Sequence, residues 1–95
     1  MASHRVEREF SGKTSREIFD RAAQVIEQLS DRYSLEHQPE VGTLSGKVGR
    51  SGVEGRYQVK GERLTVDLEF SFLIPGVLRQ KVQEEVAGRL DRLFT

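Results

Sequence analysis

The sequence predicts an α+β domain of two layers, in which two helices cover one face of an antiparallel sheet of about four to five strands. Two segments have apolar residues at intervals of three and four, which is typical of amphipathic helices. The segments between them alternate apolar and polar residues, as strands do. The expected order is β-α-β-β-β-β-α, and the length of 95 residues fits one domain spanning residues 1–95.

The composition excludes several classes of function. The chain has no cysteine, which excludes disulfides, thiolate nucleophiles and cysteine-based zinc sites. Fifteen basic and fifteen acidic residues cancel, so we expect no nucleic-acid partner. No apolar run resembles a signal peptide or reaches the ~18 residues of a membrane span. We therefore expect a soluble, cytoplasmic protein of bacterial type that needs no cofactor.

The first helix has a clear start signal. Thr14 precedes Glu17 by three positions, which is the spacing of a capping box. Residues 4–10 alternate before it and predict a short edge strand, because their apolar face is poor. The apolar face of the helix is expected to consist of Ile18, Phe19, Ala22, Val25, Ile26, Leu29 and Tyr33.

The middle of the chain favours strands and turns. Residues 34–38 predict a strand with Leu35 and His37 inward, ended by Pro39. Residues 41–48 offer a further strand with apolar positions at period two. Six of the nine glycines lie between residues 42 and 61, which argues against a helix there.

Residues 53–60 and 63–70 predict a hairpin. Both segments alternate strictly, and Gly61-Glu62 between them fits a two-residue type II′ turn. One face of the hairpin is apolar and the other charged, so we expect a covered face and a wet face. The turn fixes the expected pairs as Lys60 with Arg63, Gln58 with Thr65, Arg56 with Asp67 and Tyr57 with Val66.

A second helix is expected after Pro75, a residue that suits the first turn of a helix. Its apolar residues recur at steps of four and three, and the helix is expected to run to the end of the chain. The predicted stripe consists of Leu78, Val82, Val86, Leu90, Leu93 and Phe94.

Motifs for nucleotide or metal binding fail on spacing. Gly12-Lys13 and Gly46-Lys47 resemble part of a phosphate loop, but neither has the first glycine of that motif at the required distance. His4 and His37 are the only imidazoles and are too far apart in sequence for a metal motif. We interpret His37 as a half-buried histidine, near Glu36 or Glu40, without a metal.

The charged residues of the hairpin do not indicate catalysis. Asp67 and Glu69 share a strand face, and Glu54 is expected opposite Glu69, but Arg56 is placed to neutralise Asp67. The stretch 46–63 is locally basic and lacks the aromatic residues of single-strand binders. We predict a protein that is not an enzyme and does not bind nucleic acid.

The segment Phe70 to Leu78 is the strongest candidate for a binding surface, since six of its nine residues are large and apolar. The need of a small domain for burial favours a closed core corner. Alternation places Phe70 and Phe72 inward, and at least one of Leu73, Ile74 and Val77 is then expected to be exposed or covered by a partner. The candidate binding residues are Phe72, Leu73, Ile74, Val77 and Leu78.

The sequence from Ser51 to Val59 and from Leu64 to Val82 resembles that of the polyhydroxyalkanoic acid system family of small bacterial proteins. The shared features are the strand with Gly52 and Gly55, the Phe-Leu-x-Pro-like corner, and the ending Leu-Asp-x-Leu-Phe. The chain departs from the family where Arg8 replaces a histidine, and near Gln38, where a tryptophan is missing. The resemblance implies an accessory protein associated with polyester granules or their genes, with no catalytic residues to carry over.

Two further functions stay open. The order of elements is similar to a shortened helix-grip domain, which implies a small carrier of an apolar ligand. The chain could also be a plain oligomerisation module. A cavity of a few hundred Å³ between sheet and helix would favour the carrier. A solid core with an exposed corner would favour binding to a granule surface, a protein partner or a second copy.

Overall fold

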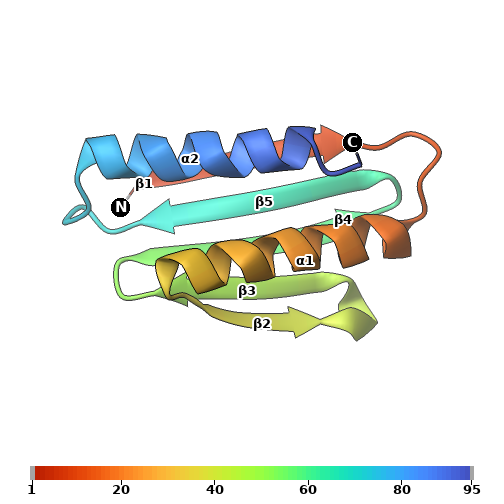
Figure 1. Ribbon diagram of the computed structural model, residues 1–95, viewed down its shortest axis with the longest axis horizontal. Helices are drawn as coiled ribbons and strands as arrows, with labels where there is room; N and C mark the ends of the chain where they lie inside the picture. The colour runs from red at the N-terminus through yellow and green to blue at the C-terminus, as the bar shows by residue number, and fades with distance from the viewer. Residues whose placement is uncertain (1, 95) are drawn as a thin grey trace.

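The computed structural model describes residues 2–94 and shows the predicted order of elements. Four strands follow the first helix, and the second helix comes last (Figure 1). The elements are β1 (Ala2–Glu9), α1 (Ser15–Tyr33), β2 (Glu36–Glu40), the short 3₁₀ turn η1 (Val41–Thr43), β3 (Ser45–Arg50), β4 (Val53–Lys60), β5 (Arg63–Phe70) and α2 (Gly76–Asp91).

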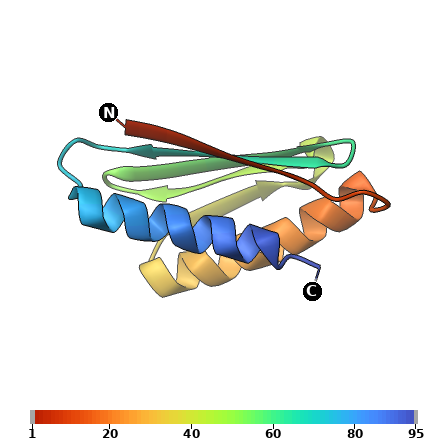
Figure 2. The same ribbon diagram turned by 90° about the horizontal axis from the view of Figure 1, so that it is seen from above.

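The strands form one antiparallel sheet in the order β1-β5-β4-β3-β2. Strand β1 lies at one edge, as its poor apolar face predicted, and β2 lies at the other. Both helices cover the same face of the sheet, and the opposite face is left uncovered (Figure 2). The predicted two-layer α+β fold is confirmed.

The capping box at the start of α1 is confirmed. The Glu17 N–H donates to Thr14 Oγ1 at 3.1 Å, and the Thr14 N–H donates to Glu17 Oε1 at 3.2 Å. The helix ends at Tyr33, and Ser34 takes the left-handed conformation with a φ of 56°. Two backbone N–H groups at the helix start, where no partner exists within the helix, therefore donate to side chains instead.

The hairpin of β4 and β5 has the predicted register. Arg56 lies opposite Asp67, Tyr57 lies opposite Val66, and Lys60 lies opposite Arg63. Gly61 has a φ of +61°, whereas the following residue keeps a negative φ, which is the pattern of a type II′ turn. The turn matches the right-handed twist of the two strands, and this explains why the sequence determines the register so well.

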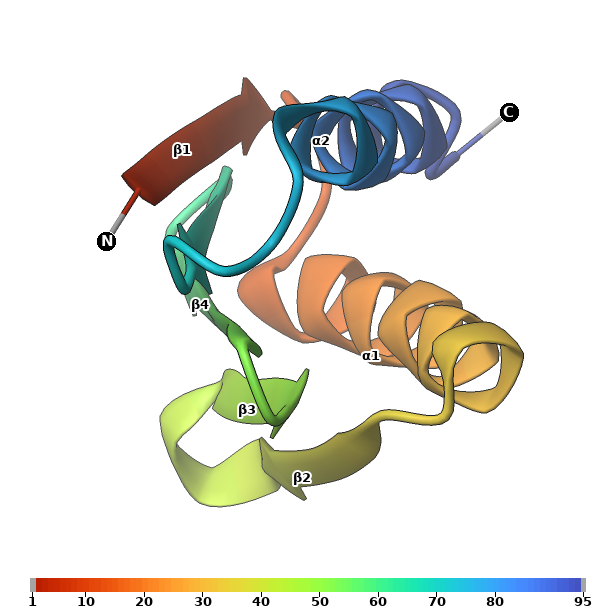
Figure 3. The same cartoon turned by 90° about the vertical axis from the view of Figure 1, so that its left-hand side faces the viewer.

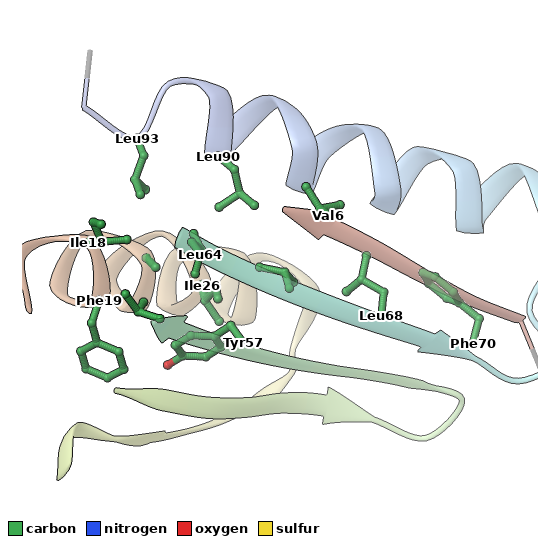
Figure 4. Packing of buried hydrophobic residues seen from close by; sticks show 13 residues of the cluster. Val6, Ile18, Phe19, Ile26, Tyr57, Leu64, Leu68, Phe70, Leu90 and Leu93 are labelled. Carbon is green, nitrogen blue, oxygen red and sulfur yellow. The ribbon is translucent and has the colours of Figure 1, made fainter. Parts of the chain in front are cut away.

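The core lies between the sheet and the helices (Figure 4). Alternate residues of β4 and β5 point into it, and α1 contributes its whole apolar face. Phe19 and Tyr57 stack with their ring centroids 6.0 Å apart. The buried apolar residues are Val6, Ile18, Phe19, Ala22, Ile26, Leu29, Tyr57, Val59, Leu64, Val66, Leu68, Phe70, Leu90 and Leu93.

Helix α2 ends at Asp91, so the prediction that it runs to the end of the chain is wrong. After it, the Leu93 N–H donates to the Leu90 carbonyl, three residues back, which tightens the last turn. This turn brings Leu93 into the core and Phe94 against Phe10, with ring centroids 5.2 Å apart. Leu90 and Leu93 are therefore fully buried, whereas Val82 and Val86 of the predicted stripe are only partly buried against the core.

The region of β2 and β3 differs from the prediction in two details. Pro39 does not end the strand, because β2 continues to Glu40 and Pro39 pairs with Gly46. An edge strand tolerates proline, since one of its sides has no partner strand. Leu44 lies outside β3 and has a φ of 51°, so the period-two pattern begins after it.

Candidate functional site

Four large apolar side chains in the turn after β5 and in the first turn of α2 are exposed. Phe72 is 79 % exposed, Leu73 77 %, Val77 83 % and Leu78 41 %. We call these four residues the apolar corner. The expectation that at least one of Leu73, Ile74 and Val77 is exposed is confirmed, and the favoured interpretation of a closed core corner is wrong.

Backbone hydrogen bonds determine which residues of the corner point outward. The Ser71 N–H donates to the Gly52 carbonyl at 2.8 Å, and the Ile74 N–H donates back to the Ser71 carbonyl at 3.0 Å. The chain therefore turns at Ser71, and the alternation that would place Phe72 inward stops at Phe70. The prediction that Phe72 faces the core is wrong for this reason.

Ile74 is the one candidate residue that packs inward. It is partly buried and belongs to the residues that line the core. A Cβ added to Gly52 would lie 3.0 Å from Ile74 Cδ1, and Gly52 has a φ of +91°. The glycine thus allows both the turn and the close approach of Ile74. Ile74 anchors the turn and leaves the apolar corner outside.

The apolar corner lies at one tip of an elongated molecule of 40 × 22 × 21 Å. Figure 3 shows the turn between β5 and α2 at the end of the sheet, where α2 begins. Leu90 is the only fully buried residue of α2, and the residues that follow the corner in its first half are exposed or only partly buried. The corner is accessible to a large flat surface because it projects at the tip.

The uncovered face of the sheet carries many charged side chains, and several of them form ion pairs. Arg5 Nε lies 2.6 Å from Asp67 Oδ1, and Arg56 Nη2 lies 3.2 Å from Glu54 Oε1. Arg56 was expected to neutralise Asp67, but Arg5 of the adjacent edge strand does so. Each of these two carboxylates has a guanidinium partner on the sheet face.

His37 points inward, as predicted, but its partners differ from the expectation. Its side chain is only 3 % exposed, and its Nδ1 lies 2.6 Å from Glu27 Oε2 of α1, rather than near Glu36 or Glu40. Its Nε2 lies 2.6 Å from the Tyr57 hydroxyl. A neutral imidazole satisfies both contacts, donating from Nδ1 to the carboxylate and accepting the tyrosine proton at Nε2.

The Glu27–His37–Tyr57 network serves the fold. It connects α1, the edge strand β2 and the central strand β4, and none of the buried side-chain polar atoms among residues 2–94 lacks a partner. Burial, followed by the nearby charge of Glu27, raises the pKa of Tyr57 to about 12. The hydroxyl packs against Gly46, where an added Cβ would lie 2.4 Å away.

A second polar network bridges the two helices. Glu85 of α2 is 17 % exposed, accepts a hydrogen bond from the Tyr33 hydroxyl, and pairs with Arg32 at 2.7 Å. The hydrogen bond to Glu85 is the main cause that raises the pKa of Tyr33. The network lies beside an apolar cavity of about 50 Å³ that Leu29, Leu68 and other residues line.

The cavity bears on the carrier interpretation, which requires a few hundred Å³. Its volume is several times smaller than that, and its walls are almost entirely apolar. Among residues 2–94, no group of three or more histidine, cysteine or acidic side chains could hold a metal. No helix within the same range is long and apolar enough to span a membrane.

Sequence reasoning missed Glu27 and Glu85 as partners of buried polar groups. Both belong to the polar positions of their helices, where a glutamate is ordinary, and no local spacing connects them to His37 or Tyr33. The one available signal was the inward position of His37, because a buried imidazole requires a partner on the facing helix.

One comparison with known proteins identifies a family. The family model described as "putative polyhydroxyalkanoic acid system protein" matches residues 5–94 of the 95-residue chain. In the comparisons with curated proteins and with solved structures, none matched. The matched range includes both helices, four complete strands, most of β1 and the whole apolar corner.

Proposed function

Because the chain belongs to the polyhydroxyalkanoic acid system family, we propose that it is a non-catalytic accessory protein of polyester storage that binds the granule surface through the apolar corner. Under this proposal the protein acts in the bacterial cytoplasm, and its partner is the surface of the stored polymer. The exposure of the apolar corner is the observation that carries the proposal.

The physical basis is the removal of apolar surface from water. Phe72, Leu73 and Val77 are each more than three quarters exposed, and they lie within six residues of one another. Burying one such side chain contributes roughly 1.5–3 kcal/mol before the costs of association. Two or three side chains that insert together contribute roughly 3–9 kcal/mol before those costs, so one copy of the corner supports a contact weaker than micromolar, which would need about 8 kcal/mol net.

The remaining surfaces support other roles less well. The uncovered sheet face is charged, which disfavours contact with an apolar polymer. The cavity of about 50 Å³ is too small for the apolar ligand of a carrier. A second copy of the chain could cover the corner, and the oligomerisation module is the competing proposal that an experiment must separate from surface binding.

The test measures co-sedimentation of the purified protein with artificial poly(3-hydroxybutyrate) particles. In the variant F72S/V77S, we expect the affinity for the particles to fall at least tenfold, with no large change in thermal unfolding, since both side chains are exposed. Val41→Ser is the matched control, because Val41 is also exposed but lies in η1, at the other end of the sheet (Figure 1).

Three outcomes decide between the functions. Loss of binding in F72S/V77S alone supports the apolar corner as the granule contact. Equal binding by all three proteins contradicts it. If the wild type is a dimer by sedimentation velocity and F72S/V77S is a monomer, the corner is an interface between two copies.

A further inference from the structure

The charged side chains within the segment that carries the apolar corner are of one sign. The segment from Phe70 to Gln83 contains Arg79 and Lys81 and no acidic residue. The acidic residues of α2 begin at Glu84, about two turns after the start of the helix. The protein as a whole has a net charge of zero, so this positive segment is a local feature.

Within residues 2–94, neither of these two cations forms an ion pair with a carboxylate, whereas at least seven arginines of this range do. The Arg79 guanidinium lies beside Gly76, where an added Cβ would be 3.4 Å from Nη2. The side chain therefore lies over the first turn of α2, next to the corner.

Arg79 and Lys81 flank the apolar corner as basic residues flank the apolar face of an interfacial helix. Such a helix inserts its apolar side chains into a lipid surface while its cations contact the anionic headgroups. The corner lies at the tip of the long axis, so insertion leaves the charged sheet face in water. This arrangement matches a lipid layer, whose interior is apolar and whose headgroups are negative.

Building on the proposed function, we propose that the apolar corner, together with Arg79 and Lys81, docks onto an anionic phospholipid surface. The lipid acyl region takes up Phe72, Leu73 and Val77, and the headgroup phosphates pair with the two cations. A second copy of the chain fits this site less well. A symmetric contact through the corner would bring Arg79 and Lys81 of both copies together without an intervening carboxylate.

The experiment compares co-sedimentation of the full chain with two kinds of vesicle and with bare polyester particles. One vesicle is pure phosphatidylcholine, and the other contains phosphatidylglycerol as well. The variant R79Q/K81Q removes the two cations of the corner. The control variant K47Q/K60Q removes the same charge from the exposed residues Lys47 and Lys60 of the sheet.

We expect the wild type and K47Q/K60Q to bind the anionic vesicles more tightly than the neutral ones. In R79Q/K81Q the affinity for the anionic vesicles should fall roughly fivefold for each charge removed, with the effect weakened by salt. Its binding to the bare polyester particles should stay unchanged, because that contact is apolar.

Each of the other results overturns one proposal or both, and the results can be told apart. Equal binding of the wild type to both vesicles, or an equal loss in K47Q/K60Q, overturns the anionic surface, even if the polyester particles are bound. Binding to anionic vesicles without binding to polyester overturns the proposed function and keeps the inference. Binding to neither overturns both, and a dimer that dissociates in F72S/V77S replaces the lipid by a second copy.

Discussion

Replacing Gly46 with alanine should destabilise the protein strongly through a single methyl group. An added Cβ would lie 2.4 Å from the Tyr57 hydroxyl oxygen and 2.5 and 2.6 Å from two carbons of its ring. The ring cannot move away easily, because it is buried, stacked on Phe19 and hydrogen-bonded to His37. Overpacking of this kind costs roughly 1–3 kcal/mol, and losing the buried hydrogen bond adds about 1–3 kcal/mol.

We therefore expect Gly46→Ala to lower the free energy of unfolding by about 2–5 kcal/mol, measured by urea denaturation with circular dichroism. Gly42→Ala is the matched control, because nothing lies within 4 Å of the added Cβ there. This control should change the free energy of unfolding by less than about 0.5 kcal/mol. A loss below about 0.5 kcal/mol in Gly46→Ala would refute the close packing of Tyr57 against this strand.

Three further predictions concern the corner, the helix bridge and the pH dependence. Leu73→Glu should leave the urea midpoint nearly unchanged, whereas Phe70→Ala should cost about 3–5 kcal/mol, because only Phe70 is buried; a large loss in Leu73→Glu would make the corner part of the core. Glu85→Gln should cost about 1–2 kcal/mol, since a charged acceptor of the Tyr33 hydroxyl is lost, and unchanged stability would mean that apolar contacts alone hold the helices together. The pKa of Tyr57 is raised to about 12 from an ordinary 10.0. Its protonated phenol therefore contributes to the free energy of unfolding in full below pH 10. That contribution is lost as the pH rises toward 12, because the phenol ionises at lower pH in the unfolded chain. Alkaline denaturation should show this loss, and Tyr57→Phe should reduce it; an unchanged profile in that variant would contradict burial as its cause.

Local rules predicted the hairpin and the first helix well. The capping box of Thr14 and Glu17 and the type II′ turn at Gly61 each depend on a few adjacent residues, and both are present as expected. A two-residue turn leaves one register possible, so the pairing of Arg56 with Asp67 followed from the position of the turn alone.

The corner was predicted only in part because its conformation depends on a distant turn. The alternation of β5 gave no sign that the chain would turn at Ser71. The carbonyl that fixes this turn belongs to Gly52, about twenty residues earlier in the sequence. Sequence patterns therefore identified the segment and the exposure of Leu73 and Val77, but assigned Phe72 to the wrong side.

The polar networks could not be predicted because they join surfaces of separate elements. Helix α1 supplies Glu27 to His37, and α2 supplies Glu85 to Tyr33, at sequence separations of 10 and 52 residues. The ion pair of Asp67 is similar. Arg56 of β4 and Arg5 of β1 both lie opposite Asp67 in the sheet. Only the side-chain conformations decide which of the two arginines pairs with it.

The contact of the apolar corner with polyester can be measured directly by fluorescence. The protein has no tryptophan, so Phe72→Trp introduces a single indole at an exposed position of the corner. On addition of poly(3-hydroxybutyrate) particles, its emission should shift to shorter wavelength as the ring leaves water. Gln58→Trp, on the exposed sheet face, should show no shift. If the protein binds the particles while the emission of Phe72→Trp stays unchanged, the corner is not the binding surface.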